Sequence, residues 1–183
     1  MFYMSVESPA SRGRILESAR QEILASGVIG LRVSAVAKSA KTSIPLIYKY
    51  FGDRDGLLTE VLGQIYAEFN AEDIKNSKMW LVKNAGKSLS GPEIVDLFPN
   101  PFGEHIRERR LWIARIVAAS LDLPKLRNKL EEIHEEVDRE FDEVIVEIHS
   151  LIEDRKHLSP QVLRSVFRGL SFGHIFTEFN YDN

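Results

Sequence analysis

Apolar residues recur at intervals of three and four along the carboxyl-terminal half of the chain, and this spacing constrains the fold more than any other feature. From position 125 to 154 the apolar positions are Leu126, Leu130, Ile133, Val137, Phe141, Val144, Ile148 and Leu151. One face of an α-helix repeats about every 3.6 residues, so the stretch predicts a long amphipathic helix. Helical spacing dominates elsewhere too, and runs that alternate apolar and polar residues, as strands do, are few. We therefore expect an all-α protein.

Short helices separated by tight turns are expected in the first part of the chain. The expected helices are 8–26, 34–40, 44–50 and, after an N-cap at Asp53, 54–69. Gly27 fits the position after a helix end, Ser43 is a typical N-cap, and Pro45 fits a first helical turn. Two short helices joined by a three-residue turn, after a longer helix, predict a helix-turn-helix in a domain of residues 8–55.

The rest of the chain, residues 56–183, predicts a second helical domain. Its later helices are expected at 93–97, 104–121, 125–154 and, after an N-cap at Ser159, 160–179. No apolar run approaches the ~20 residues that span a bilayer, and no secretory signal is visible. The absence of cysteine excludes disulfides and thiolate chemistry. We expect a cytoplasmic protein without a membrane partner.

The charge is distributed unevenly along the chain. Overall the net charge is −3, yet the first 62 residues hold 8 basic side chains against 6 acidic ones, and the remainder 16 against 21. From Arg32 to Arg54 five basic residues face one acid, Asp53. A basic, compact segment fits a polyanionic partner, although a chance fluctuation of surface charge would look the same.

A helix-turn-helix gives this basic segment a specific chemistry. The second short helix of such a motif enters the major groove of DNA, while hydroxyls, cations and N–H groups at helix starts hold phosphates. The residues with phosphate-binding chemistry near these positions are Ser34, Ser43, Tyr48, Lys49, Tyr50 and Arg54. The candidates for contacts with bases are Ile44, Leu46 and Lys49. Core packing is the alternative for the aromatic residues, and a first-turn charge pair with Asp55 is the alternative for Arg54.

Residues 12–62 resemble the DNA-binding domain of TetR-type transcriptional regulators. The shared pattern is an alanine-rich second helix, a recognition helix that ends in a Leu-Tyr-x-x-Phe motif, a capped pair of a basic and an acidic residue, and paired leucines. In this chain the pattern is carried by Val36-Ala37, Ala40, Ser43, Tyr48-Lys49-Tyr50-Phe51 and Gly52-Asp53-Arg54-Asp55-Gly56-Leu57-Leu58. The resemblance implies a homodimeric regulator, more often a repressor, that binds double-stranded DNA at a palindromic operator.

The family pattern also implies roles for individual residues. Phosphate contacts are implied for Ser34, Ser43, Tyr48, Tyr50 and Arg54, and base or groove contacts for Ile44, Pro45, Leu46 and Lys49. The chain departs from the pattern at Lys41, where the family usually has glycine, so this residue must adopt a left-handed conformation or alter the turn. Ile44 and Leu46 are apolar where polar residues are frequent, which predicts weaker direct readout of bases, supplemented by DNA shape.

The second domain offers two sets of candidate residues. An apolar cavity for an apolar or amphipathic small-molecule effector would be lined by Trp80, Phe98, Phe102, Trp112, Ile116 and Phe141, which could equally be packed core. By the resemblance, the last two long helices would form a dimer interface through Phe141, Ile148, Val166, Gly169, Gly173 and Phe176.

Two other functions are consistent with parts of the sequence. A helical sensor or protein-interaction module with a degenerate DNA-binding domain would explain Lys41 and the apolar Ile44 and Leu46. A metal-dependent helical catalyst could use Glu131 and His134, but such carboxylate bundles need the Glu-x-x-His pair twice and one copy is present. We expect neither enzymatic activity nor a metal or other cofactor.

Overall fold

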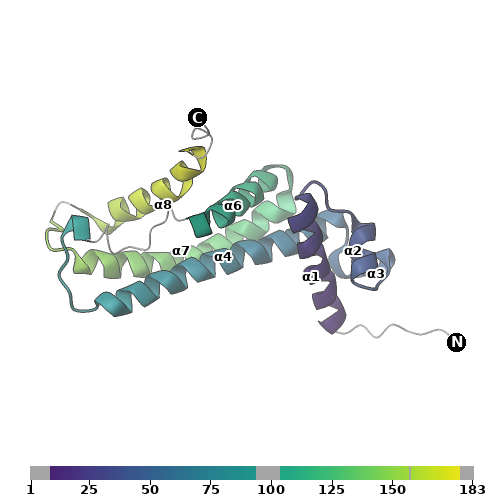
Figure 1. Ribbon diagram of the computed structural model, residues 1–183, viewed down its shortest axis with the longest axis horizontal. Coiled ribbons are helices and arrows are strands. Elements are labelled where there is room, and N and C mark those ends of the chain that lie inside the picture. The colour runs from purple at the N-terminus through teal and green to yellow at the C-terminus, as the bar shows by residue number, and fades with distance from the viewer. Residues whose placement is uncertain (1–8, 94–103, 157, 178–183) are drawn as a thin grey trace. The chain divides into compact units, whose positions relative to one another are not determined.

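The computed structural model describes residues 9–93, 104–156 and 158–177, and within these ranges it is almost entirely helical, as expected. The helices are α1 (Pro9–Ser26), α2 (Val33–Ser39), α3 (Ile44–Phe51), α4 (Arg54–Asn84), α6 (Glu104–Asp122), α7 (Pro124–Leu151) and α8 (Pro160–Thr177), as labelled in Figure 1. Among the described residues, β-type pairing is limited to a single parallel bridge between Leu89 and Ile152.

The described residues form two compact units. The first unit runs to Ile65 and also takes in Ile116–Leu130, and the second comprises Tyr66–Arg115 and the chain from Glu131 onward. Helices α4, α6 and α7 therefore each supply residues to both units. The first unit extends past the expected boundary at residue 55 because the first three turns of α4 bury a row of leucine, valine and isoleucine side chains.

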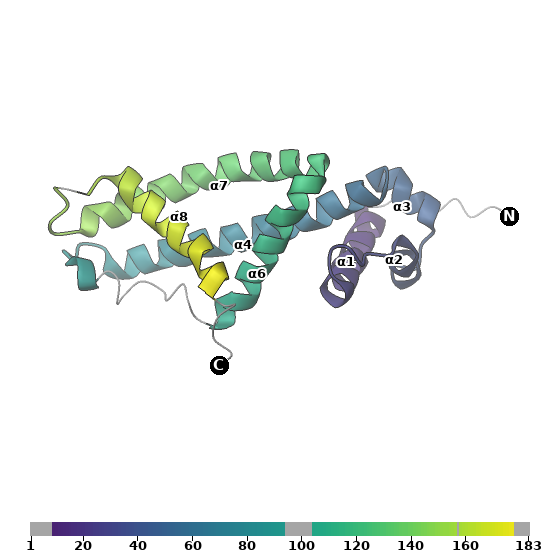
Figure 2. The same ribbon diagram turned by 90° about the horizontal axis from the view of Figure 1, so that it is seen from above.

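The first unit is built on buried side chains at helical spacing. In α1 these are Ile15, Ala19 and Ile23, in α2 Val36 and Ala37, in α3 Ile47 and Phe51, and in α4 Leu57, Leu58, Val61, Leu62 and Ile65. α2 packs against both α1 and α3 (Figure 2). Each buried aliphatic side chain stabilises this arrangement by about 1.5–3 kcal/mol relative to exposure.

α4 is much longer than the sequence pattern predicts. An end near Phe69 was expected, but the helix continues to Asn84. No glycine or proline occurs between these two residues, and the first residue in a left-handed conformation after them is Gly86, with φ of 76°. The prediction was wrong because it ended the helix where the apolar spacing weakens rather than where a residue breaks the backbone.

Most other helix ends lie close to their expected positions. α6 matches within one residue, α7 starts at Pro124 and ends three residues early, and α8 starts at Pro160. Ser159 caps α8, since its hydroxyl accepts a hydrogen bond from the Val162 N–H at 3.3 Å. Gly91–Glu93 are helical, and the rest of the expected helix at 93–97 lies outside the described residues, as does the end of the last helix.

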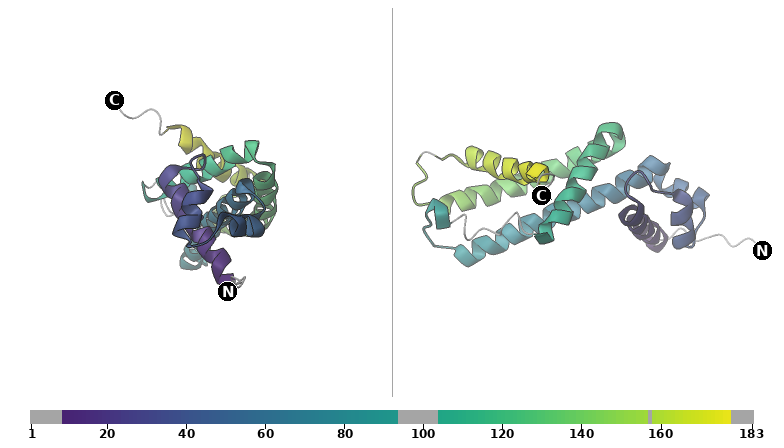
Figure 3. Two further views of the ribbon diagram at one scale, coloured as in Figure 1. Left: turned by 90° about the vertical axis from the view of Figure 1, so that its right-hand side faces the viewer. Right: turned by 45° about the horizontal axis from the view of Figure 1, so that its top comes forward.

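The second unit has its own apolar core between α4, α7 and α8, whose ribbons lie together in Figure 3. Its buried members are Trp80, Leu81, Leu89, Val144, Ile145, Ile148, Leu151 and Leu163. Ile148, which the sequence analysis placed in a dimer interface, is fully buried in this core of its own chain. None of the described helices has the length and apolar character needed to cross a membrane.

Candidate nucleic-acid interface

α3 has one buried face and one exposed face. Ile47 is fully buried and Phe51 nearly so, whereas Ile44 and Tyr48 are 37% and 41% exposed. Residues three and four apart lie on the same side of a helix, so Ile47 and Phe51 share the buried side, and Ile44 lies at the border between that side and the exposed one. Pro45 and Lys49 are also exposed and Leu46 is half-buried. The exposed face thus carries most of the side chains expected to contact a DNA groove.

Backbone caps fix both ends of α3. Ser43 has extended backbone angles (φ −107°, ψ 150°), and its hydroxyl accepts a hydrogen bond from the Leu46 N–H at 3.4 Å, so it is the expected N-cap. Gly52, with φ of 80°, ends the helix and donates its N–H to the Tyr48 carbonyl at 2.7 Å. The next helix begins at once, because Asp53 Oδ1 accepts from the Gly56 N–H at 2.6 Å.

The turn between α2 and α3 is made with Lys41 in a left-handed conformation. Its φ is 51°, and no other described residue except glycine has a positive φ. The N–H groups that close the turn belong to Lys41, bonded to the Lys38 carbonyl, and to Thr42, bonded to the Ala37 carbonyl at 2.9 Å. Of the two possibilities predicted for Lys41, a left-handed conformation or an altered turn, the first is confirmed. The lysine adopts the backbone conformation that glycine usually supplies.

Replacing Lys41 by glycine is expected to raise the free energy of unfolding by up to about 1 kcal/mol, because glycine adopts this φ without a steric cost. Urea denaturation followed by circular dichroism measures the change. The matched control is Lys38→Gly, which places glycine inside α2 and should lower stability by about 0.5–1 kcal/mol. A loss of stability in Lys41→Gly would mean that the turn is not strained.

Ser34 lies one position further into α2 than expected. The helix begins at Val33 after Arg32, which has extended backbone angles and no side-chain capping bond. Ser34 is nevertheless exposed in the first turn. The side chain of Arg32 is 72% exposed and its Nε donates to Glu22 at 3.1 Å. Arg32, like the exposed Lys38 and Lys41, was counted in the basic segment but not singled out as a candidate.

The two tyrosines of α3 differ in their surroundings. Tyr48 is exposed, and its hydroxyl can reach a phosphate beside the helix. The Tyr50 hydroxyl is buried and has no hydrogen-bond partner among the described residues. Its ring lies 6.1 Å from that of Phe51, in a tilted arrangement. In this conformation Tyr50 supports the packing of α3 more directly than a phosphate contact.

Arg54 also has intramolecular partners. Its guanidinium donates to the carbonyls of Leu31 at 3.1 Å and Ile29 at 2.9 Å, with a longer contact to Val28 at 3.5 Å. Asp55 lies 3.7 Å away. Because these carbonyls are acceptors for a cation at the start of a helix, no phosphate is needed to explain an arginine at this position. A phosphate contact by Arg54 stays a prediction.

Ion pairs connect the helices around this motif. Lys125, in the first turn of α7, donates to Asp53 Oδ2 at 2.7 Å, and this hydrogen bond, followed by the one from the Gly56 N–H, lowers the pKa of Asp53. Arg12 of α1 pairs with Glu60 of α4 and lies over the Phe51 ring, with its guanidinium carbon 5.2 Å from the ring centroid. The cap of α4 and the end of α3 are therefore tied to α1 and α7.

In the second unit, the expected cavity residues are mostly packed. Trp80 is part of the apolar core, Phe141 packs against that core, and Trp112 is buried. Ile116 is fully buried and belongs to the first unit. Phe98 and Phe102 lie outside the described residues. An open groove on this unit is lined by other residues: Lys78, Leu81, Val82, Ala85, Glu143, Val144 and Glu147.

The outer face of α8 is open where dimer contacts were expected. Val166 is 49% exposed, and a Cβ added at Gly169 would meet no atom within 4 Å. Phe141, by contrast, is partly buried against the core of its own chain. The surroundings of Gly173 and Phe176 lie outside the described part.

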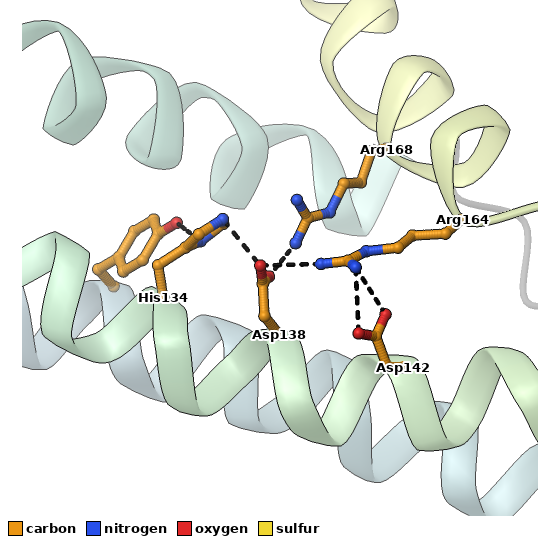
Figure 4. Close-up of polar contacts among 6 residues, drawn as sticks. His134, Asp138, Asp142, Arg164 and Arg168 are labelled. Carbon is orange, nitrogen blue, oxygen red and sulfur yellow. Dashed lines mark hydrogen bonds and ion pairs between the residues drawn. The ribbon is translucent and has the colours of Figure 1, made fainter. Parts of the chain in front are cut away.

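Polar residues of α4, α7 and α8 meet around Asp138 of α7 (Figure 4). Arg164 donates to Asp138 at 2.8 Å and to Asp142 at 3.0 Å, and Arg168 also pairs with Asp138. His134 Nε2 lies 3.4 Å from Asp138, and its Nδ1 lies 3.5 Å from the Tyr66 hydroxyl. Burial, with the nearby positive charges of Arg168 and Arg164, lowers the pKa of His134.

The same contacts describe the surroundings of the candidate metal ligand His134. Its two ring nitrogens face Asp138 and Tyr66. The described residues contain no group of three or more histidine, aspartate or glutamate side chains arranged to hold a metal ion. The acidic face of α7 instead meets basic side chains, since Lys78 of α4 also donates to Glu140, at 2.6 Å, and this bond raises the pKa of Lys78.

Comparison with known proteins agrees with this geometry. Residues 15–61 match the family model described as "Bacterial regulatory proteins, tetR family". The HTH-type transcriptional repressor NicS of Pseudomonas putida is 33% identical over 69 residues, which are 38% of this chain and 32% of NicS. The HTH-type transcriptional repressor SCO4008 of Streptomyces coelicolor is 29% identical over 133 residues, 65% of this chain and 68% of that protein. The chain thus matches about a third of the length of NicS.

Solved structures extend the likeness of fold beyond the first unit. A TetR-family regulator from Rhodococcus sp. aligns over 91% of this chain and 85% of its own, with a TM-score of 0.56 and 23% identity. The regulator FadR from Bacillus subtilis, solved in complex with stearoyl-CoA, aligns over 93% and 90%, with a TM-score of 0.50 and 19% identity. The family match begins within α1 and runs through α2 and α3 into α4, so the part of the chain that holds the exposed side of the second short helix is similar to regulatory proteins of the TetR family.

Proposed function

We propose that the protein is a homodimeric, cytoplasmic repressor that inserts α3 of each protomer into the major groove of a palindromic operator. A small-molecule effector, apolar or amphipathic, would control its release from DNA. Two relatives are named as transcriptional repressors, which favours repression over activation. FadR, which shares the fold, was solved with stearoyl-CoA, an amphipathic molecule.

The observation that carries the proposal is the division of α3 into a buried and an exposed face. Ile47 and Phe51 hold the helix to its unit, and Ile44, Tyr48 and Lys49 are left facing outward. An apolar side chain can contact a thymine methyl group, and a lysine can bind a base edge or a phosphate. The exposed hydroxyls of Ser34 and Ser43 add donors at the starts of α2 and α3.

Dimerisation would set the distance between the α3 helices of the two protomers. Half-sites one helical turn apart need recognition helices separated by about 34–36 Å. The exposed Val166 and the open surroundings of Gly169 on α8 support a second copy of this chain as the neighbour of that face. An effector could bind more tightly to a dimer in which the two α3 helices have a different spacing. It would then lower operator affinity only as far as its own affinities for the two conformations differ.

Lys49→Ala tests the role of α3. Removing this exposed cation is expected to weaken operator binding about tenfold and to reduce the slope of log K against log salt concentration by about 1. Fluorescence anisotropy with a duplex selected from random DNA by the wild-type protein measures both quantities.

Lys83→Ala is the matched control, because Lys83 lies in the last turn of α4, in the second unit. It should leave affinity and salt slope unchanged. If the wild-type protein selects no sequence from random DNA, the proposal fails. The alternative, a helical sensor or interaction module with a degenerate DNA-binding domain, is then favoured. If it selects a sequence and Lys49→Ala binds that sequence normally, α3 does not contact the duplex through this residue.

A further inference from the structure

Arg54 joins the two ends of the helix-turn-helix. The segment between Leu31 and Arg54 contains α2, the turn and the whole of α3. At its far end, Arg54 Nε donates to the Leu31 carbonyl at 3.1 Å and Nη2 donates to the Ile29 carbonyl at 2.9 Å. These two hydrogen bonds, here termed the carbonyl clasp, join the two ends of the segment. Neither of them involves a residue of α2 or α3.

The loop that supplies the carbonyls is tightly built. Gly27 has a φ of 75°, and a Cβ added at Gly30 would lie 2.2 Å from the Ser26 carbonyl oxygen. Residues 27–31 thus turn closely past the end of α1, and they present the carbonyls of Val28, Ile29 and Leu31 toward one guanidinium. Ile29 itself is 94% exposed, so its side chain does not fix the loop.

The clasp depends on the shape of the guanidinium and not on its charge alone. Nε and Nη2 lie on one edge of a rigid plane, and each donates to a different carbonyl. A lysine ammonium is a single nitrogen on a flexible stem, so it cannot occupy both positions. A positive charge in the first turn of α4 is opposed by the helix dipole, and these carbonyls, with Asp55, offset that cost.

We propose that Arg54 is a positioning residue for DNA binding: by clasping the Ile29 and Leu31 carbonyls it holds α2 and α3 in the orientation that fits the major groove. The inference rests on the proposed function of α3. It assigns Arg54 a role distinct from the phosphate contact that the family pattern implies, and the two roles differ in what a lysine at this position would do.

Arg54→Lys separates the two roles because it keeps the charge and removes the paired donors. Operator affinity should fall about tenfold, as expected for the loss of hydrogen bonds from a charged group, while the salt slope stays at the wild-type value. Amide hydrogen exchange in residues 28–33 should become faster. Arg14→Lys, an exposed arginine of α1, is the matched control and should change none of these quantities.

The outcomes are distinguishable from those of the α3 test. If Lys49→Ala weakens binding and Arg54→Lys binds within about twofold of wild type, the proposed function stands and the clasp is overturned. If neither the wild-type protein nor Arg54→Lys selects an operator, the proposed function itself fails. Thermal unfolding of each variant shows whether a loss of affinity comes from global unfolding.

A measurement on the wild-type protein covers the case in which Arg54→Lys does not fold. In a sample with 15N-labelled arginine, the Arg54 Nε–H signal should be protected from solvent exchange in the free protein. The protection should persist when the selected operator duplex is added. Rapid exchange in the free protein, or a change to a phosphate-bonded signal with DNA, would overturn the clasp.

Discussion

Replacing Ile47 by alanine should lower the free energy of unfolding of the first unit by about 2–4 kcal/mol, the range found for large-to-small substitutions at buried isoleucines. Ile47 is fully buried and anchors α3 from its inner face, so the cavity lies between the recognition helix and its own unit. Operator affinity should fall together with this free energy, because α3 loses its fixed position. Urea denaturation and anisotropy titrations measure the two effects.

Ile44→Ala makes the same chemical change at an exposed position one turn earlier in the same helix. Ile44 is 37% exposed, so its truncation should change stability by less than about 0.5 kcal/mol. It should instead alter which base pairs are selected, since an apolar contact to a thymine methyl group is lost. Equal losses of stability in the two variants would contradict the division of α3 into buried and exposed faces.

The helix-turn-helix could be predicted from the sequence because its signals are local. Ser43, Gly52 and Asp53 each act on backbone groups within a few residues, and the structure shows all three at the helix ends where their types place them. Lys41 follows the same logic, since a tight turn forces its φ whatever the rest of the chain does. Capping and turn chemistry need no knowledge of tertiary contacts.

The contacts that the sequence does not predict belong to residues whose surroundings are set by distant parts of the chain. Ile148 lies in the apolar seam of α7, and spacing alone does not say whether a seam faces the same chain or a second copy. Arg54 finds its acceptors 23 residues earlier, in a loop whose carbonyls carry no sequence signal. The Tyr50 hydroxyl is likewise buried by packing that the family pattern does not encode.

The acidic face of α7 shows the same limit. Between Glu131 and Glu143 the sequence has eight acidic residues and one arginine, and nothing nearby in the sequence shows which side chains balance this charge. In the structure Arg164 and Arg168 of α8 approach this face, and both pair with Asp138. The charges that balance the helix therefore come from residues at least 22 positions away.

Asp138→Ala should destabilise the attachment of α8 to α7 more than any other single change on this acidic face. Asp138 and Arg164 are about a quarter exposed, and Arg168 somewhat more. Without the shared carboxylate, Arg168 loses its charge partner and Arg164 keeps only Asp142 among its described contacts. Allowing for solvent screening of partly exposed pairs, the expected loss is about 1–2 kcal/mol in the free energy of unfolding.

Asp142→Ala is the matched control for Asp138→Ala. Asp142 is half exposed and pairs with Arg164, which would still have Asp138, so its loss should cost less than about 1 kcal/mol. Urea denaturation gives both values. Hydrogen exchange of the α8 amides shows whether α8 unfolds first, as expected if Asp138 is the common partner of Arg164 and Arg168. Because α8 carries the exposed Val166 proposed to face a second copy, Asp138→Ala should also weaken dimerisation in sedimentation experiments. If the two aspartate variants lose equal stability, the arginines are held by separate pairs and Asp138 is not their common anchor.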